Sequence, residues 1–212
     1  MEPEQIQDIN ARIAACTRCP LSATRTQTVP GHGDPHAELL FIGEAPGFYE
    51  DQQGVPFVGR SGALLDQLLE GINLTRSDVF VANIIKCRPP DNRDPIPTEI
   101  ATCQPYITEQ IGGINPKLIV TLGRFAMQYF LPGAAMGRSH GQPIHAGPHT
   151  IYPLYHPAAA LRQGRLHQVL RDDFARIPEL LRTTQRPDPN DLTPPIPHDT
   201  TPTDQANQLK LL

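Results

Sequence analysis

Short apolar runs alternate with longer stretches of helical periodicity through most of the chain. Four runs have the length and the β-branched content of buried strands: 38–42, 78–85, 117–122 and 151–154. Apolar residues recur at helical spacing in five other segments: 5–15, 63–69, 98–111, 123–130 and 166–181. Strands that alternate with helices predict an α/β fold, with three layers (α/β/α) around a central, mainly parallel four-stranded sheet.

Polar residues mark the expected ends of two of these helices. Ser61 is placed to cap the helix over 63–69, which Gly71 or Asn73 should end. Thr98 is placed to cap the helix that follows it. Helix boundaries of this kind predict where the connecting loops begin.

Two long loops interrupt the alternation. The loop 43–60 is rich in glycine, and a loop of more than about a dozen residues without its own structure is usually functional. Residues 133–149, rich in glycine and histidine, are expected to hold an irregular hairpin around 143–146. The first loop is therefore the better candidate for a binding site.

The chain is long enough for one α/β domain, which we place at 1–182. Six of its 24 prolines fall in the 30 residues 183–212, which have no apolar periodicity. That composition predicts a disordered, proline-rich tail. A solvated tail and a partner-binding tail are both open, because the last four residues, 209–212, are apolar enough to dock.

The net charge of −4 is not the signature of a nucleic-acid binder, but the distribution of charge matters more than the sum. Residues 156–171 carry three arginines and no carboxylate, and 86–93 carries Lys86, Arg88 and Arg93 against one aspartate. Both segments adjoin candidate pocket loops. A basic rim for phosphate contact and an ordinary solvated surface are the two interpretations.

No stretch approaches the roughly 20 apolar residues of a membrane span. The first ten residues are acidic and lack the apolar run of a signal peptide. We therefore expect a cytoplasmic protein without membrane contact, and a monomer, since no apolar surface stripe stands out. Disulfides are not expected in that compartment.

All four cysteines fit one ligand set: Cys16 and Cys19 in a C-x-x-C pair, then Cys87 and Cys103. A lone C-x-x-C pair is weak evidence, whereas four thiols with a paired start are stronger. Tetrahedral thiolate ligation implies zinc or an iron–sulfur cluster. The spacing does not choose between these, and unligated core cysteines are the third possibility.

Two loops that follow predicted strands present polar groups. The strand 38–42 runs into 43–47, which contains Glu44, and the strand 151–154 is followed by His156. In open α/β sheets, ligands bind where the carboxyl ends of strands meet such loops. The sequence therefore places a candidate pocket between these two loops.

These motifs together resemble the uracil-DNA glycosylase superfamily, and within it the iron–sulfur type called family 4. The segment 43–47 (GEAPG) resembles the G-E-[GA]-P-G motif, 54–59 (GVPFVG) resembles G-x-P-F-V-G, and 156–158 (HPA) resembles H-P-x. The resemblance covers roughly residues 10–182. It implies a [4Fe–4S] cluster on Cys16, Cys19, Cys87 and Cys103, where it would staple the N-terminal helix to the rest of the domain.

The resemblance also implies how uracil is held. Phe57 would stack on the base, Asn83 would read its O4 and N3–H edge, and His156 would donate to O2 as negative charge develops there. An Asn amide in a fixed orientation would reject cytosine, which exchanges the donor and acceptor. The structural alternatives are a core Phe57, a strand-terminal turn at Asn83 and a buried structural His156.

Glu44, or Glu50 in the same loop, is expected to orient the attacking water or to stabilise the sugar cation. Family 1 enzymes carry an aspartate where this chain has Ala45. The family 4 resemblance therefore implies catalysis by charge stabilisation rather than by a strong base. The backbone of the segment formed by Gly43, Ala45, Pro46 and Gly47 is expected to contact the substrate and to help hold the water.

The loop after His156 is expected to contact DNA. By resemblance, Leu161 would wedge into the base stack from the minor groove, with Arg162 beside it. Arg165 and Arg88 complete the predicted DNA contacts. The alternative for Leu161 is packing at a helix N-terminus.

Three activities are compatible with these motifs. The first is a monofunctional uracil-DNA glycosylase that releases uracil and leaves an abasic site, without a nucleotide cofactor. The second is a protein that captures uracil-DNA without turnover, but the related capture branch uses a histidine in an inserted loop, and 88–97 has no histidine. The third, a nucleotide-phosphate binder at 43–47, lacks both common glycine-rich phosphate motifs.

Overall fold

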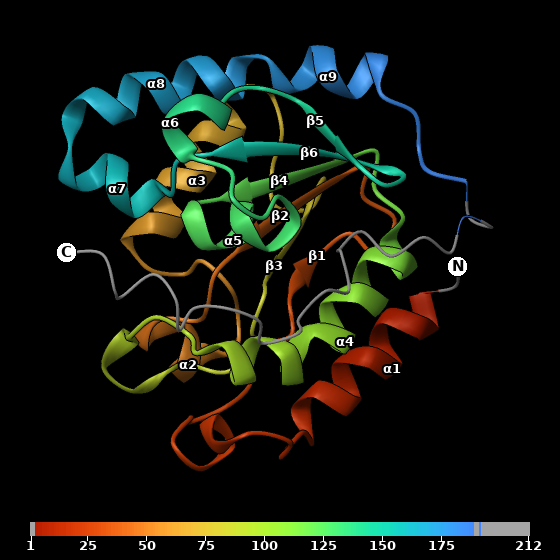
Figure 1. Ribbon diagram of the computed structural model, residues 1–212, viewed down its shortest axis with the longest axis vertical. Helices are drawn as coiled ribbons and strands as arrows, with labels where there is room; N and C mark the ends of the chain where they lie inside the picture. The colour runs from red at the N-terminus through yellow and green to blue at the C-terminus, as the bar shows by residue number, and fades with distance from the viewer. Residues whose placement is uncertain (1–2, 189–190, 192–212) are drawn as a thin grey trace, which may run out of the picture.

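The computed structural model describes residues 3–188 and 191, and contains a six-stranded mixed sheet with helices on both faces (Figure 1). The spatial order of the strands is β1-β3-β2-β4-β6-β5. The strands are β1 (His32–Gly33), β2 (Leu39–Gly43), β3 (Phe80–Asn83), β4 (Leu118–Leu122), β5 (Ile144–Ala146) and β6 (His149–Leu154).

The four central strands, β3, β2, β4 and β6, pair in parallel and correspond to the four predicted strands. β1 and β5 pair antiparallel with β3 and β6 at the two edges. The prediction of four strands was therefore wrong, while the mainly parallel sheet and the hairpin around 143–146 are confirmed. The two edge strands have two and three residues, which is too short to produce a recognisable pattern.

The helices mostly follow the predicted segments. They are α1 (Pro3–Ala14), α2 (Phe48–Gln53), α3 (Arg60–Glu70), α4 (Pro97–Ile114), α5 (Arg124–Phe130), α6 (Met136–Ser139), α7 (Pro157–Arg162), α8 (Gly164–Ala175) and α9 (Ile177–Thr183), with 3₁₀ turns η1 (Pro20–Ala23) and η2 (Pro90–Asn92). The single helix predicted over 166–181 is divided into α8 and α9. Pro178 in the first turn of α9 lacks the N–H that would continue α8.

Both predicted N-caps were wrong, because other groups begin these helices. α3 starts at Arg60 after Gly59, so Ser61 lies inside the helix. α4 starts at Pro97, which needs no N–H partner at a first helical position. Glu99 then accepts a hydrogen bond from the backbone N–H of Ile96 at 3.0 Å, which satisfies the start of α4.

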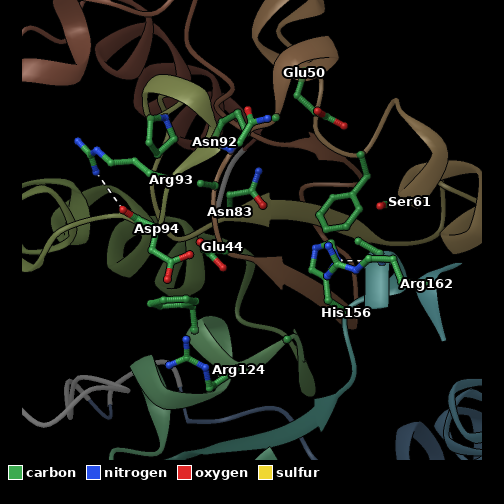
Figure 2. Close-up of a pocket in the computed structure, with 18 residues that line it drawn as sticks. Glu44, Glu50, Ser61, Asn83, Asn92, Arg93, Asp94, Arg124, His156 and Arg162 are labelled. Carbon is green, nitrogen blue, oxygen red and sulfur yellow. Dashed lines mark hydrogen bonds between the residues drawn. The ribbon is translucent and has the colours of Figure 1, made fainter. Parts of the chain in front are cut away.

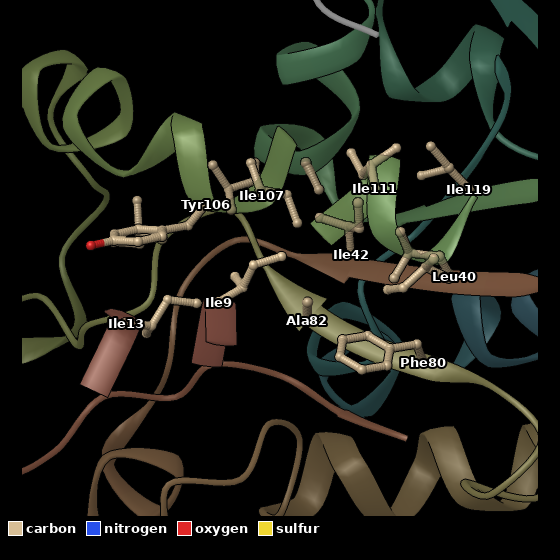
Figure 3. Close-up of a cluster of buried hydrophobic side chains, with 14 of the residues drawn as sticks. Ile9, Ile13, Leu40, Ile42, Phe80, Ala82, Tyr106, Ile107, Ile111 and Ile119 are labelled. Carbon is tan, nitrogen blue, oxygen red and sulfur yellow. The ribbon is translucent and has the colours of Figure 1, made fainter. Parts of the chain in front are cut away.

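Each face of the sheet is covered by helices because the central strands are apolar on both faces. Leu39 and Phe41 of β2 pack with leucines of α3 and with Phe174 of α8, whose ring stacks on Phe41 at 5.7 Å between centroids. On the opposite face, Leu40 and Ile42 pack with isoleucines of α1 and α4 (Figure 3). Successive side chains of β2 point to opposite faces of the sheet and therefore pack into two separate cores.

The parallel register decides which residues meet at the carboxyl edge of the sheet. Gly43 at the end of β2 lies opposite Asn83 at the end of β3. The backbone pairing continues past both strands, since Ile84 N–H donates to the Gly43 carbonyl at 3.0 Å and Ile85 N–H to the Glu44 carbonyl at 3.2 Å. The loops after β2 and β3 therefore leave the sheet side by side.

Helix α2 lies within the predicted loop 43–60 and was not expected, since its polar sequence has no apolar periodicity. Its position depends on Asp51, which is buried and accepts the backbone N–H of Thr26 on both carboxylate oxygens, at 2.9 and 3.0 Å. A buried carboxylate therefore fastens α2 to the segment that follows Cys16 and Cys19.

The predicted tail begins close to the end of α9, at Thr183. Arg186 still contacts the domain, because its guanidinium donates to the backbone carbonyls of His36, Ile114 and Asn115. Most of the predicted disordered tail, residues 189–190 and 192–212, lies outside the described residues. In the part of the chain that is described, no helix has the length and apolarity needed to span a membrane.

Candidate active site

A cavity of about 580 Å³ opens at the carboxyl ends of the parallel strands (Figure 2). It brings together nine residues that the sequence singled out: Glu44, Ala45, Pro46, Gly47, Glu50, Phe57, Asn83, His156 and Arg162. They come from the loops after β2, β3 and β6. The structure therefore gathers into one pocket groups that are more than 100 residues apart in the sequence.

Gly43 and the remaining predicted DNA contacts do not line this cavity. Leu161 is 42% exposed on α7, one residue before Arg162. Arg165 is exposed in the first turn of α8. Arg88 lies beside the cavity, where its guanidinium stacks over the exposed ring of Phe48 at 5.2 Å.

Two charged residues of the pocket, Asp94 and Arg124, were not predicted from the sequence. Figure 2 shows Glu44, Asp94 and Arg124 on one side of the cavity, and His156 with Arg162 on the other. Arg124 follows β4, the one central strand whose carboxyl end had been assigned no site residue. The rule that ligands bind at strand ends would have pointed to it. Other lining residues not anticipated are Ser61, Pro89, Asn92, Gly123, Phe125 and Ala158, whereas Arg93 was expected only on a basic rim.

Gly43 stands directly behind the pocket, where no side chain fits. A Cβ atom there would lie 2.4 Å from Oδ1 of Asn83 and 2.8 Å from Cζ of Phe57. Both distances are far below van der Waals contact, so the two side chains reach their positions because this residue is glycine. Among the described residues, none forms a hydrogen bond with the Asn83 side-chain amide, and its donor and acceptor are left for a ligand.

Phe57 is held in a left-handed backbone conformation, with φ of 55°, which is unfavourable for a bulky residue. Its carbonyl accepts a hydrogen bond from Arg76 at 2.9 Å. Gly62 of α3 packs so closely that a Cβ atom there would lie 1.7 Å from the same carbonyl. The ring is buried and stacks on His156, with 5.6 Å between centroids and 25° between planes.

Glu50 holds the backbone that carries Phe57. Its Oε1 accepts hydrogen bonds from the backbone N–H groups of Val58 at 3.0 Å and Gly59 at 3.2 Å. Gly59 is the N-cap residue of α3, so this carboxylate also stabilises the positive end of that helix. One of the two glutamate candidates is thus engaged in positioning the loop.

Glu44 is the other candidate, and its carboxyl group has a different environment. Partial burial is the main cause that raises its pKa to about 7, the nearby Asp94 adds to the rise, and Arg124 opposes it. A carboxyl group with this pKa exchanges protons near neutral pH, as general acid–base catalysis requires.

His156 is fixed in one tautomer. Its Nδ1 accepts a hydrogen bond from the backbone N–H of Ala158 at 3.0 Å, so in the neutral ring the proton is on Nε2. Burial lowers the pKa of His156 to about 4, Arg162 lowers it further, and Glu50 opposes the change. The imidazole is therefore a neutral hydrogen-bond donor at physiological pH.

Cys16, Cys19, Cys87 and Cys103 line a second cavity, next to Arg25 and Tyr106. None of the four forms a disulfide. Arg25 donates to Sγ of Cys87 at 3.1 Å. Among the described residues, no three cysteine, histidine or carboxylate side chains lie close enough to hold a single metal ion. The four thiols thus surround one space without converging on one point.

The prediction that Lys86 belongs to a basic rim was wrong. Lys86 is only 1% exposed, so it cannot meet a phosphate at the surface. Arg93 from the same segment lines the cavity but forms an ion pair with the buried Glu99 at 2.6 Å. Arg88, which is half-buried, and Arg93, which is exposed, are therefore the cations of the segment 86–93 that reach the surface.

Comparison with known proteins agrees with this arrangement. Residues 30–177, which include every residue lining the active-site cavity, match the family model described as the uracil DNA glycosylase superfamily. The chain belongs to this superfamily. It is also similar along most of its length to proteins named type-4 uracil-DNA glycosylase, and it belongs with them.

Three of these relatives show the extent of the similarity. The chain is 42% identical to the type-4 enzyme of Sulfurisphaera tokodaii over 193 residues, which cover 86% of this chain and 88% of that protein. It is 43% identical to that of Saccharolobus solfataricus, covering 80% and 83%, and 42% identical to that of Archaeoglobus fulgidus, covering 84% and 94%. The predicted resemblance to family 4 is thereby confirmed.

The tautomer and charge of His156 in this type-4 protein are directly testable. In nitrogen NMR spectra of the histidine-labelled protein, we expect His156 to remain neutral with the proton on Nε2 down to about pH 5. Because the folded-state pKa is lowered, stability should fall as the pH drops from about 6.5 toward 4. Replacing Arg162 with Gln should raise the titration midpoint. A midpoint near 6.5 in the unmodified protein would contradict the assignment.

Proposed function

We propose that this protein removes uracil from DNA by hydrolysing the N-glycosidic bond, which leaves free uracil and an abasic site for base excision repair. One observation carries the proposal: a single cavity combines an aromatic face, a free amide and a neutral imidazole donor, from Phe57, Asn83 and His156. These are the three groups needed to stack, read and release a uracil base. Membership of the type-4 glycosylases supports the same activity.

Uracil must leave the base stack to enter such a cavity. We propose that it stacks on Phe57 and that the Asn83 amide pairs with its O4 and N3–H edge. The amide is fixed by its nearly complete burial and by its close contact with Gly43. Cytosine would present a donor and an acceptor in exchanged places, which leaves buried polar groups unpaired.

The departing base carries the electron pair of the broken bond between C1′ and N1. We propose that Nε2–H of His156 donates to O2 of uracil, where much of this negative charge collects. The hydrogen bond from a neutral donor in a buried site becomes stronger as negative charge develops on its acceptor, and the donor does not change its own protonation. The hydrogen bond from Ala158 N–H to Nδ1 keeps the Nε2 proton in place.

A water molecule then adds to C1′ of the sugar cation and loses one proton. We propose Glu44 as the group that orients this water and accepts the proton. Its carboxyl group lines the cavity and, within the described part of the chain, forms no hydrogen bond of the kind that fixes Glu50. Burial and Asp94 raise the pKa of this carboxyl group, and Arg124 opposes the rise.

DNA would be held on both sides of the cavity. On one side, Leu161 is the proposed wedge in the base stack and Arg162 the proposed phosphate contact. On the other, the stacked pair of Arg88 and Phe48 offers a cation and an aromatic face to an unstacked base or its phosphate. Arg165 extends the first of these surfaces along α8.

We further propose that the four cysteines bind a [4Fe–4S] cluster. Each cysteine of such a cluster binds a different iron, so the sulfurs surround the cluster and need not meet at one point. That requirement fits the four thiols that line one cavity. The cluster would cross-link the end of α1, the loop after β3 and α4.

The activity is tested with an oligonucleotide that contains one uracil. The wild-type protein should produce strand cleavage only after alkali treatment, which cuts abasic sites. Replacing Asn83 with Ala should lower the single-turnover rate about a hundredfold or more. Ser77→Ala, an exposed change remote from the cavity, is the control and should retain full activity. Denaturation-resistant retention of the oligonucleotide without cleavage would instead indicate covalent capture.

The proposed role of Glu44 predicts how kcat/KM depends on pH. Because the base form of Glu44 accepts the proton, kcat/KM should rise with pH to a plateau, with a midpoint near the pKa of about 7. Asp94→Asn should shift the midpoint to lower pH, because Asp94 raises the pKa of Glu44. Glu44→Gln should lower the plateau about 10²-fold or more and remove the midpoint. An unchanged profile in the Glu44→Gln variant would exclude this role.

The cofactor is tested by its metal content. Protein purified without oxygen should contain about four iron and four sulfide per chain. Cys103→Ser should lose most of this iron and lower the free energy of unfolding by several kcal/mol, since metal binding is coupled to folding. One zinc per chain, or full stability without any metal, would contradict the proposal.

A further inference from the structure

Lys86 is a buried amine without a carboxylate partner among the described residues. Its Nζ donates to the backbone carbonyl of Asn83 at 2.7 Å and to Oε1 of Gln110 at 2.6 Å, both of which are neutral acceptors. Burying an amine in this way is costly, and an apolar side chain of similar volume would often be as stable or more so. The lysine therefore needs an explanation beyond packing.

The two acceptors of Nζ lie in different parts of the molecule. Asn83 ends β3 at the active-site cavity, and Gln110 belongs to α4, the helix that carries Cys103. Gln110 is itself fixed, because its amide donates to the Pro30 carbonyl at 2.8 Å. The Lys86 side chain thus ties the end of β3 to α4.

The backbone of Lys86 contacts the cysteine cavity. Its N–H donates to Sγ of Cys103 at 3.3 Å, and the next residue is Cys87. Lys86 therefore forms a hydrogen bond with a cysteine sulfur through its backbone N–H and with the Asn83 carbonyl through its side chain. Only three residues separate Asn83 from Cys87, so a change at the cysteines has a short covalent path to the pocket.

We propose that Lys86 is a positioning residue for base recognition, which holds the Asn83 peptide so that the side-chain amide faces uracil. The inference rests on the proposed reading of uracil by Asn83. The Asn83 carbonyl lies where the regular strand ends, and without Nζ its peptide could rotate and move the attached side chain. A displacement of about 1 Å in a positioning group can reduce a rate about a hundredfold.

Lys86 does not line the active-site cavity, which excludes direct contact with the base. Its Nζ is a hydrogen-bond donor whether the amine is charged or neutral, so positioning does not depend on its protonation. The hydrogen bonds of Nζ also connect base recognition to the cysteine site. α4 carries both Gln110 and Cys103, and the segment 84–87 joins Asn83 to Cys87.

The test is a double-mutant cycle with Lys86→Met and Asn83→Ala, measured by single-turnover cleavage of a uracil-containing oligonucleotide. Lys86→Met keeps the apolar stem and the backbone N–H to Cys103, and removes only the Nζ donor. We expect a loss of about tenfold to a hundredfold in the wild-type background and less than twofold in the Asn83→Ala background. Iron content should be unchanged in Lys86→Met.

Tyr152→Phe is the matched control. It removes another buried hydrogen bond to a backbone carbonyl, from the Tyr152 hydroxyl to Asp173 at 2.9 Å, on the far side of the sheet from Lys86. It should lower stability similarly without changing the cleavage rate. A merely structural role for Lys86 predicts the opposite: equal losses in both backgrounds of the cycle, which would overturn the proposal.

Two further measurements cover the cases in which Lys86→Met does not fold or the wild-type protein does not cleave uracil-DNA. If Lys86→Met does not fold, Gln110→Leu removes the second acceptor of Nζ, and a smaller loss with the same non-additivity is expected. If wild-type protein does not cleave uracil-DNA, the proposed function fails. The same cycle is then measured as binding of uracil-containing against thymine-containing oligonucleotide. Additive effects on that ratio would overturn the positioning role independently.

Discussion

The pocket depends on one close approach, between Gly43 at the end of β2 and Asn83 at the end of β3. Parallel pairing sets these two residues opposite each other, and the missing side chain at Gly43 leaves the space that Asn83 and Phe57 occupy. Both residues are nearly completely buried, so neither can move far. The glycine thus lets the Asn83 amide, proposed to read the base, and the Phe57 ring, proposed to stack on it, both approach the end of β2.

Burial then gives the ionisable groups different properties. The pKa of Glu44 is raised to about 7 and that of His156 is lowered to about 4, and burial is the main cause of both changes. One group can accept a proton near neutral pH while the other remains a neutral donor. Pairs of groups whose environments push their pKa values apart are typical of acid–base sites. Glu50, by contrast, stabilises the loop between α2 and α3.

Much of this site could be predicted from sequence, for physical reasons that differ by residue. Glu44 and His156 follow apolar strands, and the carboxyl ends of parallel strands meet at one edge. Asn83, the last residue of β3, was expected in the site because of the family resemblance. Asp94 was missed because its approach to Glu44 depends on how two loops close in space, whereas Arg124, at the carboxyl end of β4, was within reach of the same strand-end rule. The burial of Lys86 was missed because a lysine in a basic segment normally lies at the surface.

The fold was likewise predictable from the sequence only in part. The four central strands have continuous apolar runs, so both their number and their parallel pairing follow from the pattern. The edge strands and α2 have no such pattern. α2 is positioned instead by single buried contacts, such as the one from Asp51 to Thr26, which no periodicity reveals.

The most direct test of the account is single-turnover uracil cleavage by Gly43→Ala, beside Gly112→Ala. The added methyl group at Gly43 must displace Asn83 or Phe57, while at Gly112 in α4 it would meet nothing within 4 Å. Because the displaced atoms at Gly43 are side-chain ends, the fold should persist. We predict a loss of about a hundredfold or more for Gly43→Ala and wild-type activity for Gly112→Ala. Cleavage by a folded Gly43→Ala variant within a few-fold of wild type would contradict the account.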